Sequence, residues 1–244
     1  MVEACIEGAV LPRVALRRAP KALIVPHAGY VYSGPVAGTA YRLLRDSTAP
    51  IRHVVMIGPS HRVALRGLAV PSATALATPL GPVPVNVEVR DRLLAAGLVQ
   101  VSDAAHAPEH SLEVQLPFLQ VALGDGFDVL PVVFGDVTTE QVGRVCDAAW
   151  DDDDTLVLVS SDLSHYLTWS EARSLDAATT RAIVGGKGDI DDEQACGARG
   201  INGLMHVARR RGCVAEVLDQ RNSGDTAGDR SRVVGYGSYA IGQA

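Results

Sequence analysis

The segment Lys21-Ala-Leu-Ile-Val-Pro-His27 sets the fold of this chain, because it is the first of three short apolar runs that each lead to a histidine. The others are His53-Val-Val-Met-Ile-Gly-Pro-Ser-His61 and Leu156-Val-Leu-Val-Ser-Ser-Asp-Leu-Ser-His165. Runs of Val, Ile and Leu bounded by Gly, Pro or Ser are typical of buried strands in a largely parallel sheet. In open α/β sheets, ligands bind beyond the carboxyl ends of the strands. We therefore expect the three histidines to face one crevice.

Strand and helix patterns alternate along the rest of the chain. The other strand patterns cover residues 127–134, 214–218 and 233–241. The helical patterns cover residues 35–44, 87–96, 139–150, 170–184 and 201–211. Residues 151–154 and 222–230 are predicted to be loops, the first of them a solvated acidic one rather than a Ca²⁺ loop. This alternation predicts a single-domain α/β sandwich over residues 1–244, with a mainly parallel or mixed central sheet and helices on both faces.

Composition argues against several classes of protein. The 244 residues are 47% hydrophobic, which suffices for a full buried core. A formal net charge of −6 argues against a general binder of nucleic acid or anionic membranes. No apolar stretch approaches the roughly 18 residues of a membrane span, and no signal peptide is expected. Four irregularly spaced cysteines without a CxxC pair are typical of reduced thiols, so we expect a cytoplasmic protein.

His27 and His61 are the first candidates for a site. Neutral imidazole is a common ligand of Zn, Fe and Cu, and two imidazoles from separate strand ends make half of a metal site. Gly29 and Gly34 allow sharp backbone turns beside His27. Either histidine alone is more often an ordinary strand-end residue. Their shared position after successive strands favours a metal or acid–base site.

Two histidine–carboxylate pairs could complete the chemistry. If residues 109–117 are helical, His110 and Glu113 share one face, which suits a ligand, a group supporting a ligand, or a base. The alternative is a helix start whose acidic residues face the helix dipole. Asp162 and His165 follow the third strand. Asp162 is also explained as a helix cap, whereas His165 is best interpreted as a proton donor or acceptor.

Cys196 lies in Gln194-Ala-Cys-Gly-Ala-Arg-Gly-Ile-Asn-Gly203, shortly before a predicted helix. A helix N-terminus lowers the pKa of a nearby thiol, which would suit a metal ligand or a nucleophile. From spacing alone, an inert buried cysteine is the favoured interpretation. Cys5, Cys146 and Cys213 are predicted to be inert.

Six segments together resemble the Memo family, whose prokaryotic members are called AmmeMemoRadiSam system protein B. They are PHAGYVYSG (26–34), GPSH (58–61), EHSLEVQLPFLQ (109–120), SSDLSHY (160–166), CGARGI (196–201) and NSGDTAGDRSRVVGY (222–236). They follow the family's order and are far more specific as a set than singly. The Ala-Gly-x-Phe-Tyr-Pro-like segment with which the family usually opens is not found in residues 1–20.

The resemblance implies an α/β fold similar to that of the class III extradiol dioxygenases, which use non-haem Fe(II). It implies a metal site of His27 and His61 with Cys196 as the third ligand. The resemblance places His110, Asp162 and His165 in the same cavity. Cysteine is softer than the carboxylate of those dioxygenases, so Cu or Zn are alternatives to a differently tuned Fe(II).

The sequence therefore suggests an Fe(II)-dependent oxidoreductase of the dioxygenase type that acts on a small oxygen-bearing substrate. His165 would be the acid–base group, oriented by Asp162, with His110 and Glu113 in support. A non-catalytic peptide- or metal-binding protein is one alternative, because eukaryotic Memo proteins are associated with signalling and phosphotyrosine-peptide binding. A Zn-dependent hydrolase is another. The family name also implies a functional link to AMMECR1-like and radical-SAM proteins.

Overall fold

Four adjacent parallel strands form the centre of the fold in this computed structural model, which describes residues 1–16, 19–47, 50–150 and 153–244. They are β1 (Ala22–Val25), β8 (Thr155–Ser160), β2 (His53–Pro59) and β7 (Asp128–Phe134), in that order across the sheet. The neighbouring pairs are all parallel. The three apolar runs that precede the histidines are therefore neighbouring strands β1, β8 and β2, and their carboxyl ends meet at one edge.

Antiparallel strands extend this centre on both sides, so that nine strands form one sheet within the described residues. Beyond β1, the sheet continues through β11 (Val233–Gly242) to β10 (Val214–Asn222), and β9 (His165–Leu167) also pairs with β11. Beyond β7 it continues through β3 (Leu68–Val70) to β6 (Gln100–Val101). A separate hairpin joins β4 (Ala75–Leu76) and β5 (Val83–Pro84).

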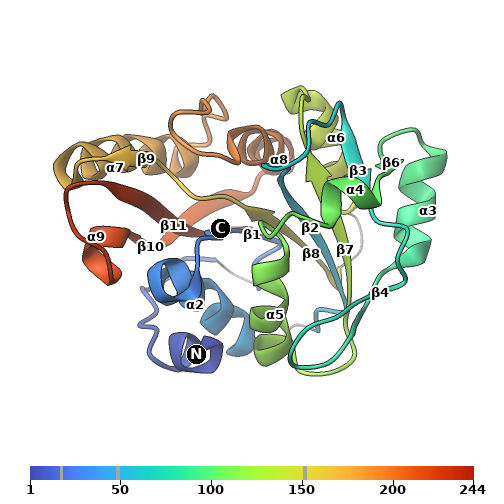
Figure 1. Cartoon of the computed structure of the whole chain (residues 1–244), viewed down its shortest axis with the longest axis horizontal. Coiled ribbons are helices and arrows are strands. Elements are labelled where there is room, and N and C mark those ends of the chain that lie inside the picture. The colour runs from blue at the N-terminus through green and yellow to red at the C-terminus, as the bar shows by residue number, and fades with distance from the viewer. Residues whose placement is uncertain (17–18, 48–49, 151–152) are drawn as a thin grey trace.

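Side chains alternate between two hydrophobic layers, one on each face of the sheet. Ala22 and Ile24 of β1 belong to one layer, and Leu23 and Val25 belong to the other. Helices that contribute side chains to the first layer are α3 (Val87–Ala95), α6 (Thr139–Ala148), α7 (Trp169–Val184) and α8 (Ala198–Arg210). Helices on the second are α1 (Val2–Glu7), α2 (Tyr30–Arg45), α4 (Asp103–His106) and α5 (Leu116–Leu123). The predicted α/β sandwich is confirmed (Figure 1).

Close packing of α1 on α2 places the first residues of the chain beside α5 (Figure 1). A Cβ atom on Gly38 would lie 2.4 Å from the carbonyl oxygen of Cys5, so only glycine permits this approach of the two backbones. Val2 and Ile6 are buried as a result. Residues of α1 thereby reach the same side of the molecule as the carboxyl ends of the central strands.

Most predicted helices and strands are confirmed to within a few residues, and the exceptions have local causes. The helix predicted from Pro35 begins at Tyr30, so Pro35 lies inside α2, where its missing N–H removes one helical hydrogen bond. Residues 222–230, predicted as a loop, contain the short helix α9 (Ser223–Thr226). The Asn222 side chain caps α9 by accepting a hydrogen bond from the Gly224 amide at 3.0 Å.

Two other regions were predicted less completely. Residues 109–112 are not helical; a 3₁₀ turn, η1 (Glu113–Gln115), precedes α5. Of the acidic loop at residues 151–154, the first two residues lie outside the described part of the chain, and the other two form a turn. Across the described ranges, none of the helices combines the length and apolarity that a membrane crossing requires.

Candidate metal centre

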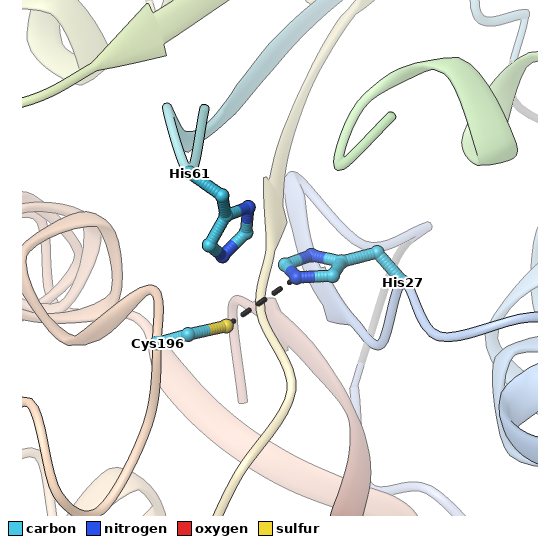
Figure 2. Close-up of side chains that lie close together, drawn as sticks. All are labelled: His27, His61 and Cys196. Carbon is cyan, nitrogen blue, oxygen red and sulfur yellow. Dashed lines mark hydrogen bonds between the residues drawn. The ribbon is translucent and has the colours of Figure 1, made fainter. Parts of the chain in front are cut away.

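Three residues from distant parts of the chain converge at the carboxyl ends of β1 and β2. His27 follows β1, His61 follows β2, and Cys196 lies just before α8. One imidazole nitrogen from each histidine and the Cys196 Sγ atom all lie within 4.8 Å of one another. Figure 2 shows the three side chains pointing toward a common centre, with the Cys196 Sγ atom 3.3 Å from the His27 Nε2 atom. The donor atoms are close enough to bind one ion after small adjustments.

The hydrogen bonds of Ser160 assign the tautomer of His27. The Ser160 hydroxyl donates its only proton to the carbonyl oxygen of Ser111, at 2.6 Å, because that oxygen can only accept. The Gln115 Nε2 group donates to the same hydroxyl at 2.8 Å. The His27 Nδ1 atom, 2.9 Å away, must therefore be the protonated nitrogen. The lone pair of His27 Nε2 is left to face Cys196 and His61.

Gln115 is itself fixed by further hydrogen bonds in the core. Its Nε2 group also donates to the carbonyl oxygen of Pro26 at 3.0 Å, which settles which end of the amide is nitrogen. Its Oε1 atom accepts a hydrogen bond from the buried Tyr41 hydroxyl at 2.7 Å. A fully buried chain of neutral groups thus runs from Tyr41 through Gln115 and Ser160 to His27. Burial lowers the pKa of His27 despite the nearby Asp162 carboxylate, so the imidazole is neutral and able to bind a metal.

A carboxylate holds His61 instead. The Glu109 Oε1 atom lies 3.1 Å from His61 Nδ1, and Glu109 also accepts hydrogen bonds from the His61, His110 and Ser111 amides. Burial raises the pKa of Glu109, but the hydrogen bonds from His61 and Ser111 outweigh burial and lower the pKa to about 2. Glu109 is therefore ionised and accepts the Nδ1 proton, which leaves the Nε2 lone pair of His61 for the centre.

Cys196 is fastened to the loop that follows β8. Its amide donates to the carbonyl oxygen of Asp162 at 3.3 Å, and the next amide, of Gly197, donates to the Ser161 hydroxyl at 2.9 Å. The sequence suggested that the following helix lowers the pKa of the thiol. In the structure, burial and then the Asp162 carboxylate raise this pKa to about 12. A thiol with this pKa is a poor nucleophile at neutral pH, whereas a bound cation displaces its proton.

Asp162 has a different partner from the one predicted. Its Oδ1 atom accepts hydrogen bonds from the backbone amides of His27, at 2.8 Å, and Ala28, at 3.3 Å. The Oδ2 atom lies 4.0 Å from His27 Nε2. No hydrogen bond joins Asp162 to His165 within the described residues, so Asp162 positions the loop after β1 rather than the His165 imidazole.

Six of the seven predicted site residues line one cavity of about 1020 Å³, whereas Cys196, which contacts His27, is not part of its lining. Its lining includes four histidines and two acidic residues of the prediction: His27, His61, His110, His165, Glu113 and Asp162. Both His110 and Glu113 are exposed, and among the described residues they form no hydrogen bond with each other. Their predicted pairing assumed a helix from residue 109, whereas the Glu109 side chain binds the local amides there and delays helix formation.

The sequence interpretation missed Glu109, Ser160 and Gln115 as supports of the site. Glu109 and Gln115 occur in the same segment as His110, and Ser160 is the last residue of its strand. A signal for Glu109 was present, because it starts the charged segment beside a histidine. Ser160 and Gln115 carry no such signal, since buried neutral polar residues are common.

Comparison with known proteins agrees with this arrangement of segments. The profile of the family described as "Memo-like protein" matches residues 1–240. The chain belongs to the Memo family. Among its relatives, a MEMO1 family protein of Aquifex aeolicus is 35% identical over 235 residues, which cover 89% of this chain and 84% of the relative. Another, from Ignicoccus hospitalis, is 38% identical over 239 residues, covering 90% of this chain and 82% of the relative.

One solved structure shares the fold of this Memo-family protein. A crystal structure of the uncharacterized protein JW3007 from Escherichia coli K12 superposes with a TM-score of 0.55 and 13% sequence identity. The match covers 91% of this chain and 99% of that chain. A likeness at this identity supports the shared α/β fold alone.

Proposed function

We propose that this Memo-family protein is a metal-dependent oxidoreductase that holds Fe(II) through His27, His61 and Cys196 and acts on a small oxygen-bearing substrate. The observation that carries the proposal is the approach of two imidazole nitrogens and one thiol sulfur to within 4.8 Å at an open cavity. Hydrogen bonds aim both imidazole lone pairs at the same point. A site with three protein ligands leaves positions open for substrate.

The donor set fits a transition metal better than Ca²⁺ or Mg²⁺, because those ions prefer oxygen ligands. Fe(II) bound there would supply one-electron redox chemistry toward O₂ and the substrate. The protein contributes the rest. His27 and His61 are fixed as neutral ligands, Asp162 holds the loop that carries His27, and His110 and His165 are cavity imidazoles able to give or take a proton.

A zinc-dependent hydrolase is the second candidate, because two imidazoles and a thiolate with an open fourth position form a recognised type of catalytic zinc site. The zinc ion would lower the pKa of a bound water. The two candidates make different demands on the metal, so metal analysis separates them before any substrate is known.

The test is metal analysis of protein purified without oxygen, for the wild type, Cys196→Ser and Cys213→Ser. Cys213 is a half-buried free cysteine outside the centre and serves as the matched control. We expect near-stoichiometric iron in the wild type and in Cys213→Ser. Loss of a hydrogen-bond partner of a metal ligand lowers metal affinity about 10- to 100-fold. Cys196→Ser replaces a proposed ligand itself and should lower iron affinity by more than that.

Zinc in place of iron would favour the hydrolase. Equal metal content in Cys196→Ser and the wild type would contradict the proposed ligand set. Absence of any tightly bound metal in all three proteins would leave a non-catalytic binding protein as the better account. Circular dichroism of each variant shows whether it folds.

A further inference from the structure

The cavity is much larger than the metal centre needs. Its volume of about 1020 Å³ lies at the upper end of the roughly 300–1,000 Å³ typical of small-molecule sites. It extends from the histidines to α5, to the turn between β4 and β5, and to the start of α1. A single small ring at the centre would leave most of this space filled with water.

Most of the apolar lining of the cavity lies away from the candidate centre. The histidines and Asp162 come from the loops around that centre. The lining farther away is mainly apolar, with Glu3, Thr78 and Glu113 as its polar exceptions. It includes six apolar residues of α1, the 77–81 turn and the α5 region: Val2, Pro79, Leu80, Val114, Pro117 and Val121. A ligand that matches both parts has one oxygen-bearing end and one apolar end.

The apolar wall is held in place by hydrogen bonds of its own. The Thr78 hydroxyl lies 2.7 Å from Gln120 Oε1 of α5, and Gln120 Nε2 donates to the carbonyl oxygen of Gly81 at 3.2 Å. The Leu80 amide donates to the Thr78 hydroxyl at 3.1 Å. The turn carrying Pro79 and Leu80 is therefore tied to α5, so the wall is formed before a ligand arrives.

Arg62 adds a charge at the polar end. It follows His61 directly and lines the cavity, and within the described residues no carboxylate pairs with it. A guanidinium with free donors beside the centre suits a carboxylate or another anionic oxygen group. Glu113, which also lines the cavity, is an exposed side chain on the α5 side of the centre.

We infer that the substrate is an amphipathic small molecule, with an anionic oxygen-bearing head at the Arg62 end and an alkyl or similar apolar body along α5. This inference deepens the proposed function, and it takes from that proposal only which end of the ligand reacts. The apolar body itself is recognised without the metal, because none of the six apolar wall residues belongs to the centre.

The test is calorimetric binding of straight-chain carboxylates, from hexanoate to dodecanoate, to the metal-free protein below their micelle concentrations. If each added methylene enters the apolar wall, affinity rises roughly threefold to fourfold per methylene until the wall is filled. Alcohols of the same chain lengths should show the same gain per methylene with weaker binding at every length.

Two substitutions locate the site. Val121→Asn, at a half-buried side chain of α5, should flatten the gain in affinity with chain length. Val184→Asn, at an exposed valine at the end of α7, is the matched control. Leu80→Asn, at a 57% exposed side chain, is the second variant should Val121→Asn fail to fold. Arg62→Gln should weaken carboxylates by about tenfold and leave the alcohols unchanged.

Affinities independent of chain length would overturn the inference, as would equal effects of Val121→Asn and Val184→Asn. Loss of alcohol binding in Arg62→Gln would show that Arg62 is not the head subsite. Because the protein is metal-free throughout, failure of the metal proposal leaves a positive result here intact. If the protein binds stoichiometric iron but carboxylate affinity does not change with chain length, the inference of an amphipathic substrate fails and the metal proposal stands.

Discussion

The two histidines of the candidate centre are held in opposite ways. His27 is 7% exposed at its side chain and reaches the core through the neutral groups of Ser160, Gln115 and Tyr41. His61 is 36% exposed at its side chain and rests on the ionised carboxylate of Glu109. Both arrangements place the proton on Nδ1 and turn Nε2 toward the centre. The same ligand state therefore has two independent supports, one based on packing and one on charge.

The two supports affect the histidines in different ways. A carboxylate beside the imidazole raises its basicity and strengthens the metal bond, whereas a neutral hydroxyl orients the ring without adding charge. Loss of the charged support should therefore mostly affect metal affinity. Loss of the neutral support should mostly affect folding stability, because it leaves buried polar groups without partners.

The largest effect is expected for Glu109→Gln. The amide removes the negative charge and brings an N–H₂ group against N–H donors, so metal affinity should fall about 10- to 100-fold. Stability should also fall by about 2 kcal/mol, since hydrogen bonds to a charged group are lost. Metal titration and urea unfolding measure the two effects. Glu113→Gln, an exposed carboxylate of the same cavity, should change neither by a comparable amount.

Asp176 is a second buried carboxyl group, and it differs from Glu109 in how its charge is stabilised. Asp176 accepts a hydrogen bond from the Ser164 amide at 3.0 Å, and burial raises its pKa from 3.8 to about 6. Its stabilising contribution is complete below about pH 4 and is lost as pH rises through about 6, which removes up to about 3 kcal/mol. Asp176→Asn should therefore be more stable than the wild type at pH 7.5 and equal to it at pH 4.

Urea unfolding at several pH values tests this prediction, with the exposed Asp125→Asn as the control. If Asp176→Asn loses as much stability between pH 4 and pH 7.5 as the wild type does, the pH dependence belongs to another group. The contrast with Glu109 is physical. Glu109 has three amide donors and one imidazole, so its charge is stabilised, whereas the hydrogen bond from Ser164 does not outweigh the burial of Asp176.

The neutral support is broken by Gln115→Leu. Ser160 loses a donor, the Pro26 carbonyl loses its amide partner, and the Tyr41 hydroxyl loses its acceptor, so stability should fall by about 2 kcal/mol. Metal affinity should fall less than in Glu109→Gln. Tyr41→Phe leaves the Gln115–Ser160 contact intact and should cost about 1 kcal/mol.

The tautomer of His27 gives a readout that a purely structural role would not change. Gln115→Leu leaves the Ser160 proton on the Ser111 carbonyl oxygen, so Ser160 can still only accept from His27 Nδ1, whereas Ser160→Ala removes that acceptor. Nitrogen NMR of the metal-free protein should therefore show His27 protonated at Nδ1 in the wild type and in Gln115→Leu, and a mixture of tautomers in Ser160→Ala. A single Nδ1–H tautomer in all three proteins would show that Ser160 does not set the tautomer of this ring.

Short-range patterns predicted much of this fold. One example is the helix at Val87–Ala95, where the Asn86 side chain caps the start by accepting a hydrogen bond from the Val89 amide at 2.9 Å, and Gly97 follows the end with a positive φ angle. Patterns of this kind depend only on neighbours in sequence. The short strands β3, β4, β5 and β6 lie outside such patterns, since two or three residues carry no measurable periodicity.

The site shows the same division. Three apolar runs that lead to histidines, and one cysteine among glycines, can be read from the amino-acid order, because residue type and periodicity are local properties. Folding was needed to show that β1 and β2 flank β8, that Glu109 rather than Glu113 supports a histidine, and that Ser160 sets the tautomer of His27. Those contacts join residues 48 and 133 positions apart, and donor–acceptor matching at that separation exists only after the chain has packed.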